Sequence, residues 1–195
     1  MTTLDLTIRR ANAHDAVTVA TLINRAGEGL PLHFWRQLAG PGQDPWAVAR
    51  KRLADPGGML ETRDAWIGLL HGQEAGLLLG YRQPARPAPV PDDAPAILRP
   101  LLELEAEAPD SFYINALATT PGMERQGVAN RLLEHAGQYA GPAGMSLIVA
   151  DSNAPARRLY ERHGYREAAR RPMVSGDWRA PGREWVLMLR GEGGA

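Results

Sequence analysis

The amino-acid sequence predicts a mixed α/β fold in a single domain that spans residues 1–195, with a central sheet flanked by helices. Two patterns carry this prediction: several short segments alternate apolar with polar residues, and others repeat apolar residues three and four positions apart. Hydrophobic residues make up 44% of the chain, and a domain of this length buries roughly 70% of its surface on folding, which allows a sizeable core.

The pattern of the first part of the chain predicts a strand, three helices and a hairpin. Alternation around Leu6 marks the strand, and Gly27 ends the first helix. Asp44 and Pro45 give the third helix an N-cap and a proline in its first turn. In chain order we expect a strand at 4–9, helices from Asn12 or Asp15 to Arg25, at 31–39 and at 44–54, and strands at 65–70 and 75–82 around a turn at 71–74.

A proline-rich segment follows the hairpin. Seven of the sixteen prolines lie between Gln83 and Pro109, and each removes a backbone donor that regular structure needs. We therefore expect an irregular surface insertion at about 83–100 within the single domain. A linker between two domains is the alternative, although the elements on either side form one continuous pattern.

The second part of the chain alternates helices and strands more regularly. Leu132 and Leu133 belong to the apolar stripe of one helix, Asn153 caps another, and Gly164 ends it. We expect a helix at 101–108, a strand at 111–119, a helix at 127–140, a strand at 145–150, a helix at 153–163 and strands at 165–171 and 183–189.

The composition excludes several classes of function. Lys plus Arg and Asp plus Glu number 22 each, and without surplus positive charge we expect neither a nucleic-acid nor a membrane partner. The absence of Cys excludes disulfides and a thiol nucleophile, and the five His show no metal-ligand spacing, so we expect no metal. No apolar run approaches the roughly 20 residues that cross a bilayer, and no signal peptide is apparent, which predicts a cytoplasmic protein.

The segment 119–130 carries the strongest chemical signal. A strand ends at Thr119, Pro121 and Gly122 set a turn, and a helix begins near Gly127. The unpaired N–H groups and the dipole at a helix start suit an anion such as a pyrophosphate. Such turns are common in α/β proteins, and both the Rossmann and the P-loop glycine signatures are missing, so a nucleotide-binding protein is the weaker alternative.

Two motifs in this part of the chain resemble those of the GNAT (Gcn5-related) N-acetyltransferase superfamily. The segment LATTPGMERQGVANRLLEHA is similar to the family's coenzyme A motif, in which Gln or Arg stands three positions before a Gly that opens a helix. The segment NAPARRLYERHGY matches the family's second motif at Asn153, Ala156, Leu159, Tyr160, Gly164 and Tyr165. The detailed match covers residues 111–171, and the preceding order of elements also fits the GNAT fold.

The resemblance implies an N-acetyltransferase that moves an acetyl group from acetyl-CoA, its cosubstrate, to a primary amine by direct attack in a ternary complex. It implies that the backbone of Leu117 and Thr119 lies along the pantetheine and that residues 125–130 hold the pyrophosphate. A main-chain N–H near the end of the same strand would polarise the carbonyl. The expected cofactor-binding residues are Leu117, Ala118, Thr119, Arg125, Gln126, Gly127, Val128, Ala129, Asn130, Asn153 and Tyr160.

Tyr160 and Asn153 each have two interpretations. In the family, the hydroxyl at the position of Tyr160 protonates or hydrogen-bonds the leaving sulfur, so we expect Tyr160 to be catalytic; without the motif it would be a core residue of its helix. Asn153 is a natural N-cap, and the resemblance also implies that it contacts the cofactor. The two roles of Asn153 are compatible.

Glu124 departs from the family's first motif, which has Gln or Arg at that position. A carboxylate beside a pyrophosphate is electrostatically unfavourable, although the side chain can point outward and Arg125 or Arg131 can supply a cation. From the sequence we expect Glu124→Arg to tighten acetyl-CoA binding. Glu124 also keeps open an alternative function, a non-catalytic acyl-CoA-binding sensor or interaction module.

No motif identifies the general base. Glu103 and Glu105 are the catalytic candidates that we favour, and the others are Glu107, Glu28, Asp151 and a water chain. Glu103 and Glu107 share a helix face, and with Asp110 they could form an acidic mouth that attracts a cationic amine; otherwise they belong to a solvated face. The acceptor stays open between a small-molecule and a protein amine, and so does pairing into a homodimer.

Overall fold

The computed structural model describes residues 5–55 and 64–191, and the chain forms two compact units. The first unit holds Met1–Gly80 and Ala116–Ala136, and the second holds Tyr81–Asn115 and Gly137–Ala195. The chain passes between them inside two strands, β3 and β4, whose bounds are Gln73–Arg82 and Phe112–Thr119. Leu4, where the predicted first strand begins, lies outside the described residues.

The sheet of the first unit has the strand order β1-β2-β3-β4. β1 (Leu6–Arg10) pairs antiparallel with β2 (Ala65–Leu70), and β2 pairs antiparallel with β3. The hairpin turn is shorter than predicted, because only His71 and Gly72 separate the strands, with φ of 50° and 77°. Two successive left-handed residues match the twist of the strands, so the second strand begins at residue 73 instead of 75.

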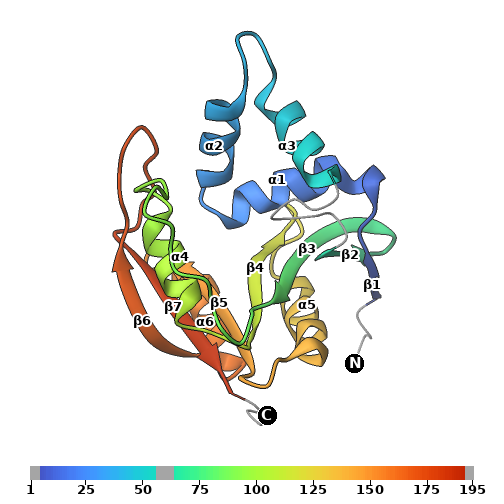
Figure 1. Cartoon of the computed structure of the whole chain (residues 1–195). Coiled ribbons are helices and arrows are strands. Elements are labelled where there is room, and N and C mark those ends of the chain that lie inside the picture. Colours follow the sequence, from blue (N-terminus) through green and yellow to red (C-terminus); the bar gives the residue numbers. More distant parts are fainter. Residues whose placement is uncertain (1–4, 56–63, 192–195) are drawn as a thin grey trace. The chain divides into compact units, whose positions relative to one another are not determined.

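The first three helices of the first unit lie at the predicted positions. Asn12 and Asp15 form a capping box around the 3-10 turn Ala13–Asp15 that leads into the first helix, whereas the Asp15 side chain makes no cap hydrogen bond to that helix itself. Asp44 caps the third helix by accepting hydrogen bonds from two N–H groups, and the last turn of that helix carries the exposed Lys51, the single lysine of the sequence. The helices, blue to cyan in Figure 1, are α1 (Ala16–Ala26), α2 (Leu30–Leu38) and α3 (Pro45–Ala54).

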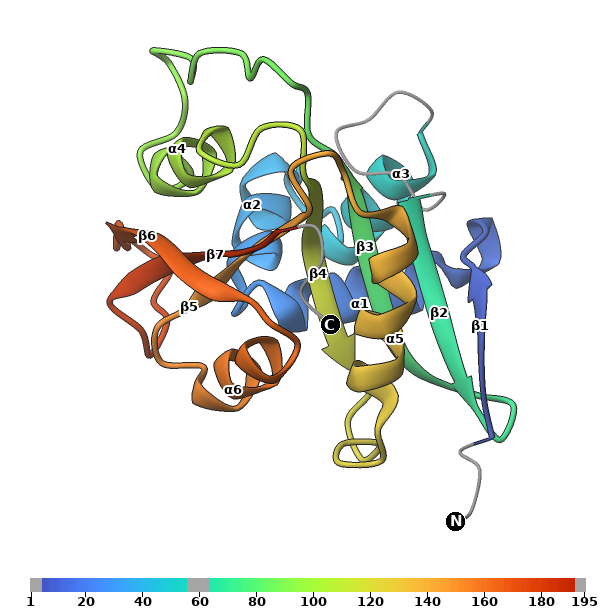
Figure 2. The same cartoon turned by 90° about the horizontal axis from the view of Figure 1, so that it is seen from below.

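Helix α5 (Val128–Ala136) follows β4 and is shorter than the predicted helix at 127–140. The α-helix ends at Ala136, and Gly137 opens a short 3-10 turn, since glycine weakens a helix interior. Figure 2 shows α5 across one face of β2 and β3, with α1 and α3 behind the opposite face. Both faces of these strands are therefore covered, which explains their nearly continuous apolar sequence.

Two glycines, Gly68 on β2 and Gly76 on β3, pair with each other beneath α5. A Cβ at Gly76 would lie 2.9 Å from the Ala118 carbonyl oxygen and 2.8 Å from Val128 Cγ1. A Cβ at Gly68 would meet only ordinary contacts, the nearest at 3.5 Å from Leu132. Gly76 therefore allows the start of α5 to approach the strands more closely than a residue with a side chain would.

The second unit contains a mixed sheet in the order β4-β5-β7-β6. β4 pairs parallel with β5, whereas the β5–β7 and β7–β6 pairs are antiparallel. Helix α4 packs against β5, β6 and β7. The bounds are α4 (Arg99–Ala106), β5 (Met145–Ala150), α6 (Ala154–Arg162), β6 (Arg166–Pro172) and β7 (Glu184–Arg190).

The strand pairs and the flanking helices confirm the predicted mixed α/β class. Residues 83–98 carry neither helix nor strand, as expected for a proline-rich segment. A single domain over 1–195 with an insertion at 83–100 stays a prediction. Among the residues that the structure describes, no helix has both the length and the apolar character needed to cross a membrane.

Candidate active site

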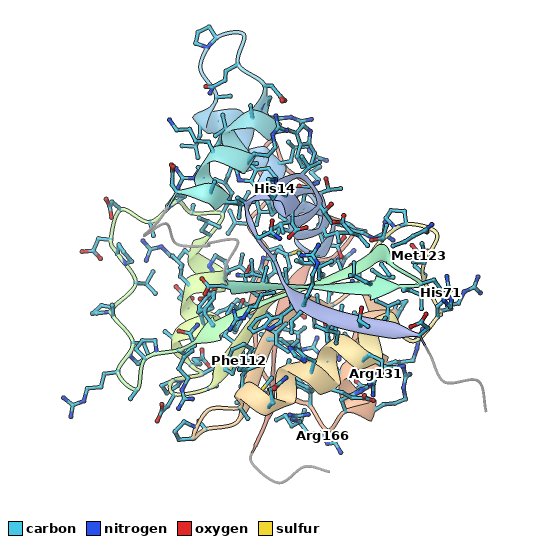
Figure 3. The ribbon with its side chains drawn as sticks, turned by 90° about the vertical axis from the view of Figure 1, so that its right-hand side faces the viewer. His14, His71, Phe112, Met123, Arg131 and Arg166 are labelled. Carbon is cyan, nitrogen blue, oxygen red and sulfur yellow. The ribbon has the colours of Figure 1, made fainter. Side chains whose placement is uncertain are left out.

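The loop from Thr120 to Gly127 joins β4 to α5 in the first unit; Figure 3 labels Met123 within the loop and Arg131 on the helix. Thr120 anchors its start: the Thr120 N–H donates to the Ala75 carbonyl at 2.8 Å, and the hydroxyl donates to the Glu74 carbonyl at 2.9 Å. The Met123 N–H donates to the Thr120 carbonyl at 2.9 Å and closes a turn. The beginning of the loop is therefore fixed to β3.

Three residues of this loop are left-handed: Gly122, Arg125 and Gly127 have φ of 86°, 62° and 81°. Left-handed residues next to right-handed ones turn successive N–H groups toward one point, which is the geometry of a backbone anion site. The first turn of α5 adds N–H groups without intrahelical acceptors and the positive end of the helix dipole. The loop and helix start therefore fit a pyrophosphate; binding by Arg125, Gln126, Gly127, Val128, Ala129 and Asn130 stays a prediction.

Strand β4 presents two different faces where the donor is expected to lie. Ala116 and Ala118 are buried in the core of the first unit, whereas Leu117 and Thr119 are half-buried on the other face. Because side chains alternate between the two faces of a strand, the two alanines pack in the core, and the face of Leu117 and Thr119 can contact another partner. Contact of Leu117, Ala118 and Thr119 with pantetheine stays a prediction.

The Glu124 carboxylate is paired on both sides within the first unit. Its Oε2 accepts a hydrogen bond from the Gly122 N–H at 2.7 Å, and its Oε1 lies 2.8 Å from Arg25 Nη2 on α1. Hydrogen bonds from the backbone of Glu124 itself and of Gly122, with help from Arg25, hold the pKa of the Glu124 carboxyl below its usual value. Because this charge already has partners, its support for a non-catalytic protein is weak.

Tyr160 and Asn153 belong to the second unit. Asn153 Oδ1 accepts a hydrogen bond from the Ala156 N–H at 3.2 Å, which confirms its N-cap role. Tyr160 is 7% exposed, and burial raises the pKa of its hydroxyl well above the usual value. The hydroxyl therefore keeps its proton at neutral pH, as a proton donor must; the roles of both residues at the cosubstrate stay predictions.

Glu105 is held in a group of polar side chains from α4, β3 and β4 in the second unit. Tyr81 Oη donates to Glu105 Oε2 at 3.3 Å and Gln83 Nε2 donates to the same oxygen at 3.2 Å. Burial raises the pKa of Glu105 above its usual value, although hydrogen bonds from Gln83, Tyr81 and Tyr113 oppose this effect. A carboxylate of raised pKa is a better proton acceptor near neutral pH.

Tyr113 of β4 lies close to both catalytic candidates of this unit. Its side chain is buried, and its ring centroid is 5.5 Å from that of Tyr81. Burial, followed by the charges of Glu105 and neighbouring tyrosines including Tyr160, raises the pKa of Tyr113 well above its usual value. Tyr113 therefore stays a neutral phenol beside Glu105 and near Tyr160.

The other predicted bases have structural partners. Arg171 of β6 donates to Glu103 at 3.1 Å and also to Glu107, so these two carboxylates do share a helix face but use it to bind one guanidinium. Asp110 lies 3.7 Å from Arg82. These three carboxylates are therefore partly neutralised and do not form an unopposed acidic mouth.

Asp151 and Glu28, the two remaining candidate bases, lie in surroundings that differ from those of Glu105. Asp151 Oδ1 accepts from the Arg183 N–H at 2.9 Å. Although burial acts to raise it, hydrogen bonds from several backbone N–H groups leave the pKa of Asp151 below its usual value, which makes a weak base. Glu28 lies in the first unit, in a left-handed turn between α1 and α2 with φ of 54°. No group of three or more His, Asp or Glu suited to a metal occurs in the part of the chain that the structure describes.

Sequence reasoning missed two sets of partners. Tyr81 of β3, Tyr113 of β4 and Gln83, which follows the end of β3, surround Glu105, but they carry no motif that marks them as functional. Arg25 is 99 residues from Glu124 in the chain, so its pairing was not visible either. The only usable signal was the placement of tyrosines in predicted strands on both sides of the proline-rich segment.

A protein family and a known protein that are similar to this chain are both described as acetyltransferases. The sequence profile described as "Acetyltransferase (GNAT) family" matches residues 43–165, more than half of the chain. The protein named "Uncharacterized N-acetyltransferase YhfO", from Bacillus subtilis (strain 168), is 28% identical over 166 residues, which cover 83% of this chain and 91% of that protein.

Two solved structures show the same fold. One, titled as the crystal structure of an acetyltransferase, has a TM-score of 0.64 at 17% identity and covers 95% of this chain and 98% of its own. An N-acetyltransferase from Staphylococcus aureus Mu50 has a TM-score of 0.61 at 15% identity and covers 94% and 99%. These likenesses confirm the predicted GNAT fold, and with the profile match over more than half of the chain they lead to one conclusion. The chain belongs to the GNAT family of acetyltransferases and is an acyltransferase.

Proposed function

We propose that this acyltransferase moves an acetyl group from acetyl-CoA to a primary amine by direct attack in a ternary complex. Bound acetyl-CoA would supply an activated thioester carbonyl. Family membership supports the donor, and so does the fit of the left-handed loop and the start of α5 to a pyrophosphate. The absence of Cys supports the direct route, because the chain has no thiol to carry an acetyl group.

The half-buried carboxylate of Glu105 is the observation that carries the mechanism. Glu105 is the candidate base whose pKa is raised by burial, whereas Glu103 is tied to Arg171 and Asp151 to backbone N–H groups. We therefore assign proton removal from the attacking amine to Glu105. Tyr81 and Gln83 hold its carboxylate through the two hydrogen bonds to Oε2.

Tyr160 completes the proton balance. The attacking nitrogen forms a bond to the acetyl carbon, the carbon–sulfur bond breaks, and the electron pair leaves on sulfur. The amine proton goes to Glu105, and the Tyr160 hydroxyl gives its proton to the leaving sulfur. A phenol that burial keeps protonated suits this step. The acceptor that we propose is a primary amine of a small molecule or of a protein.

Thermal unfolding with and without acetyl-CoA tests donor binding. A ligand at about 100 times its Kd adds about 2.7 kcal/mol to the free energy of unfolding, so acetyl-CoA should raise Tm while ATP and NAD should not. Thiol release from acetyl-CoA is then measured across a panel of small amines and peptides. Because the chain contains no Cys, it contributes no thiol of its own. Stabilisation without release by any amine would contradict the proposed transfer.

A further inference from the structure

Glu124 connects two parts of the first unit that are distant in sequence. Its carboxylate accepts the Gly122 N–H at 2.7 Å inside the loop and pairs with Arg25 at 2.8 Å in the last turn of α1. Both side chains are about half exposed, at 48% for Arg25 and 43% for Glu124. The Glu124 side chain therefore bonds both to another residue of its own loop and to α1.

The beginning of the same loop is attached to β3. Thr120 donates to the Ala75 carbonyl through its N–H and to the Glu74 carbonyl through its hydroxyl. The Glu74 carboxylate in turn accepts a hydrogen bond from the Thr18 hydroxyl of α1. Helix α1 thus reaches the middle of the loop directly through Arg25 and the start of the loop indirectly through Glu74.

The part of the loop that must keep a strained shape begins directly after Glu124. Arg125 is left-handed at φ 62°, a conformation that is unfavourable for a residue other than glycine. Such a residue stays in place only when neighbouring contacts fix it. The two contacts of Glu124 act immediately before Arg125, where they oppose relaxation of the loop.

We propose that Glu124 is a positioning residue, which holds the loop from Gly122 to Gly127 in the conformation that receives the pyrophosphate of acetyl-CoA. This inference rests on the proposed function, since it concerns binding of the same donor. It reverses the sequence-based expectation for Glu124→Arg. An arginine there loses the Gly122 hydrogen bond and faces Arg25, so acetyl-CoA binding should weaken.

Three variants separate the two contacts. Glu124→Ala loses both, Arg25→Gln loses the ion pair, and Glu124→Gln keeps an acceptor for Gly122 without the charge. We expect Glu124→Ala to weaken acetyl-CoA binding in titration calorimetry about five- to tenfold, and the other two about twofold, since a hydrogen bond to a charged acceptor outweighs an exposed ion pair. The matched control is Glu134→Ala, which removes the exposed Arg131–Glu134 pair of α5 and should leave the Kd unchanged.

Steady-state kinetics distinguish positioning from a general loss of structure. Glu124→Ala should raise KM for acetyl-CoA about fivefold, change kcat less than about twofold and leave KM for the amine unchanged. Its Tm without ligand should fall by less than about 2 °C. A parallel fall in kcat and Tm would overturn the proposal, because it would indicate a structural role only.

A charge exchange provides a further check. Arg25→Glu combined with Glu124→Arg restores the ion pair but not the Gly122 contact, so its Kd should lie between those of the wild type and Glu124→Arg. If Glu124→Arg tightens binding, the positioning role is wrong while the proposed function stands. If the wild type shows no binding of acetyl-CoA at all, both the proposed function and the positioning role are wrong.

Discussion

At the scale of single residues, Glu105 links pH to both activity and stability. Burial raises its pKa above the usual value of 4.5, so the folded state binds this proton more tightly than the unfolded state does. The stability that comes from this group is fully present below pH 4.5 and is lost as pH rises through the raised pKa. Above that pKa the carboxylate is charged in a half-buried position, which favours proton uptake from an amine.

Glu105→Gln separates these two effects. We expect kcat/KM to fall about 100-fold, because the proton acceptor is lost, and the rise of wild-type activity with pH through the Glu105 pKa to disappear. The free energy of unfolding at pH 7 should not fall, since a charge in a half-buried position is removed. Glu103→Gln is the matched control and should change kcat/KM by less than about threefold, because it loses only a partly exposed pair with Arg171.

Tyr160→Phe tests the proton donor. The variant keeps the ring in its buried position and loses the hydroxyl, so we expect kcat to fall at least about tenfold while the Kd of acetyl-CoA changes little. Single-turnover rates and titration calorimetry measure the two quantities separately. Turnover equal to that of the wild type would remove Tyr160 as the acid and return it to the packing role that its burial also permits.

The sequence could not distinguish Glu105 from its neighbours. Glu103 and Glu105 lie in one short helix and Glu107 directly follows its end, and how far each side chain is shielded from water depends on where α4 packs. The structure pairs the outer two with Arg171 and directs Glu105 toward Tyr81 and Gln83. Burial and long-range partners decide the pKa, and neither can be obtained from local spacing.

At the scale of elements, Gly76 determines how closely α5 lies on β3. Gly76→Ala places a Cβ 2.9 Å from the backbone oxygen of Ala118, which cannot move as a flexible side chain can. We expect a loss of about 1–3 kcal/mol in the free energy of unfolding, measured with urea, and weaker acetyl-CoA binding, because the start of α5 must shift.

Gly68→Ala is the control for Gly76→Ala. It adds the same methyl group to the paired strand position, where the nearest atom is 3.5 Å away. Its stability should therefore stay within about 1 kcal/mol of the wild type. Equal effects of the two substitutions would show that the methyl group acts through strand propensity and not through the contact with α5.

Element ends were predictable where a side chain marks them. Asn12, Asp44 and Asn153 accept hydrogen bonds from helix N–H groups, as their positions predicted. The end of α5 was placed too late because the 3-10 turn at 137–139 continues its local pattern. The hairpin turn was placed too long because residues 73–74 are polar yet belong to β3, a choice that strand pairing makes.

At the scale of the whole molecule, the sequence predicted the family and fold but only part of the candidate site. Motifs at 119–130 and 153–165 fall on the loop before α5 and on α6, and the fold follows their order. No motif marks the residues around Glu105, because strand pairing and helix packing gather them from separate segments.

Net charge predicts how the whole chain responds to pH. Positive and negative side chains cancel at pH 7, and the uptake of protons below pH 7 makes the net charge positive. We therefore expect self-association, measured by static light scattering, to be greater at pH 7.5 than at about pH 5.5. Association that is unchanged or greater at the lower pH would mean that a specific contact, and not net charge, controls it.

The exposed Lys51 on α3 has a consequence for the enzyme as its own substrate. Because it is the chain's single lysine, self-acetylation on an ε-amine can add one acetyl group per molecule and no more. Intact-mass spectrometry can therefore follow that side reaction as a single 42-dalton step at one known position. Lysine-specific labels would likewise attach at α3 alone, far along the chain from the loop and the Glu105 carboxylate that we propose for acetyl transfer.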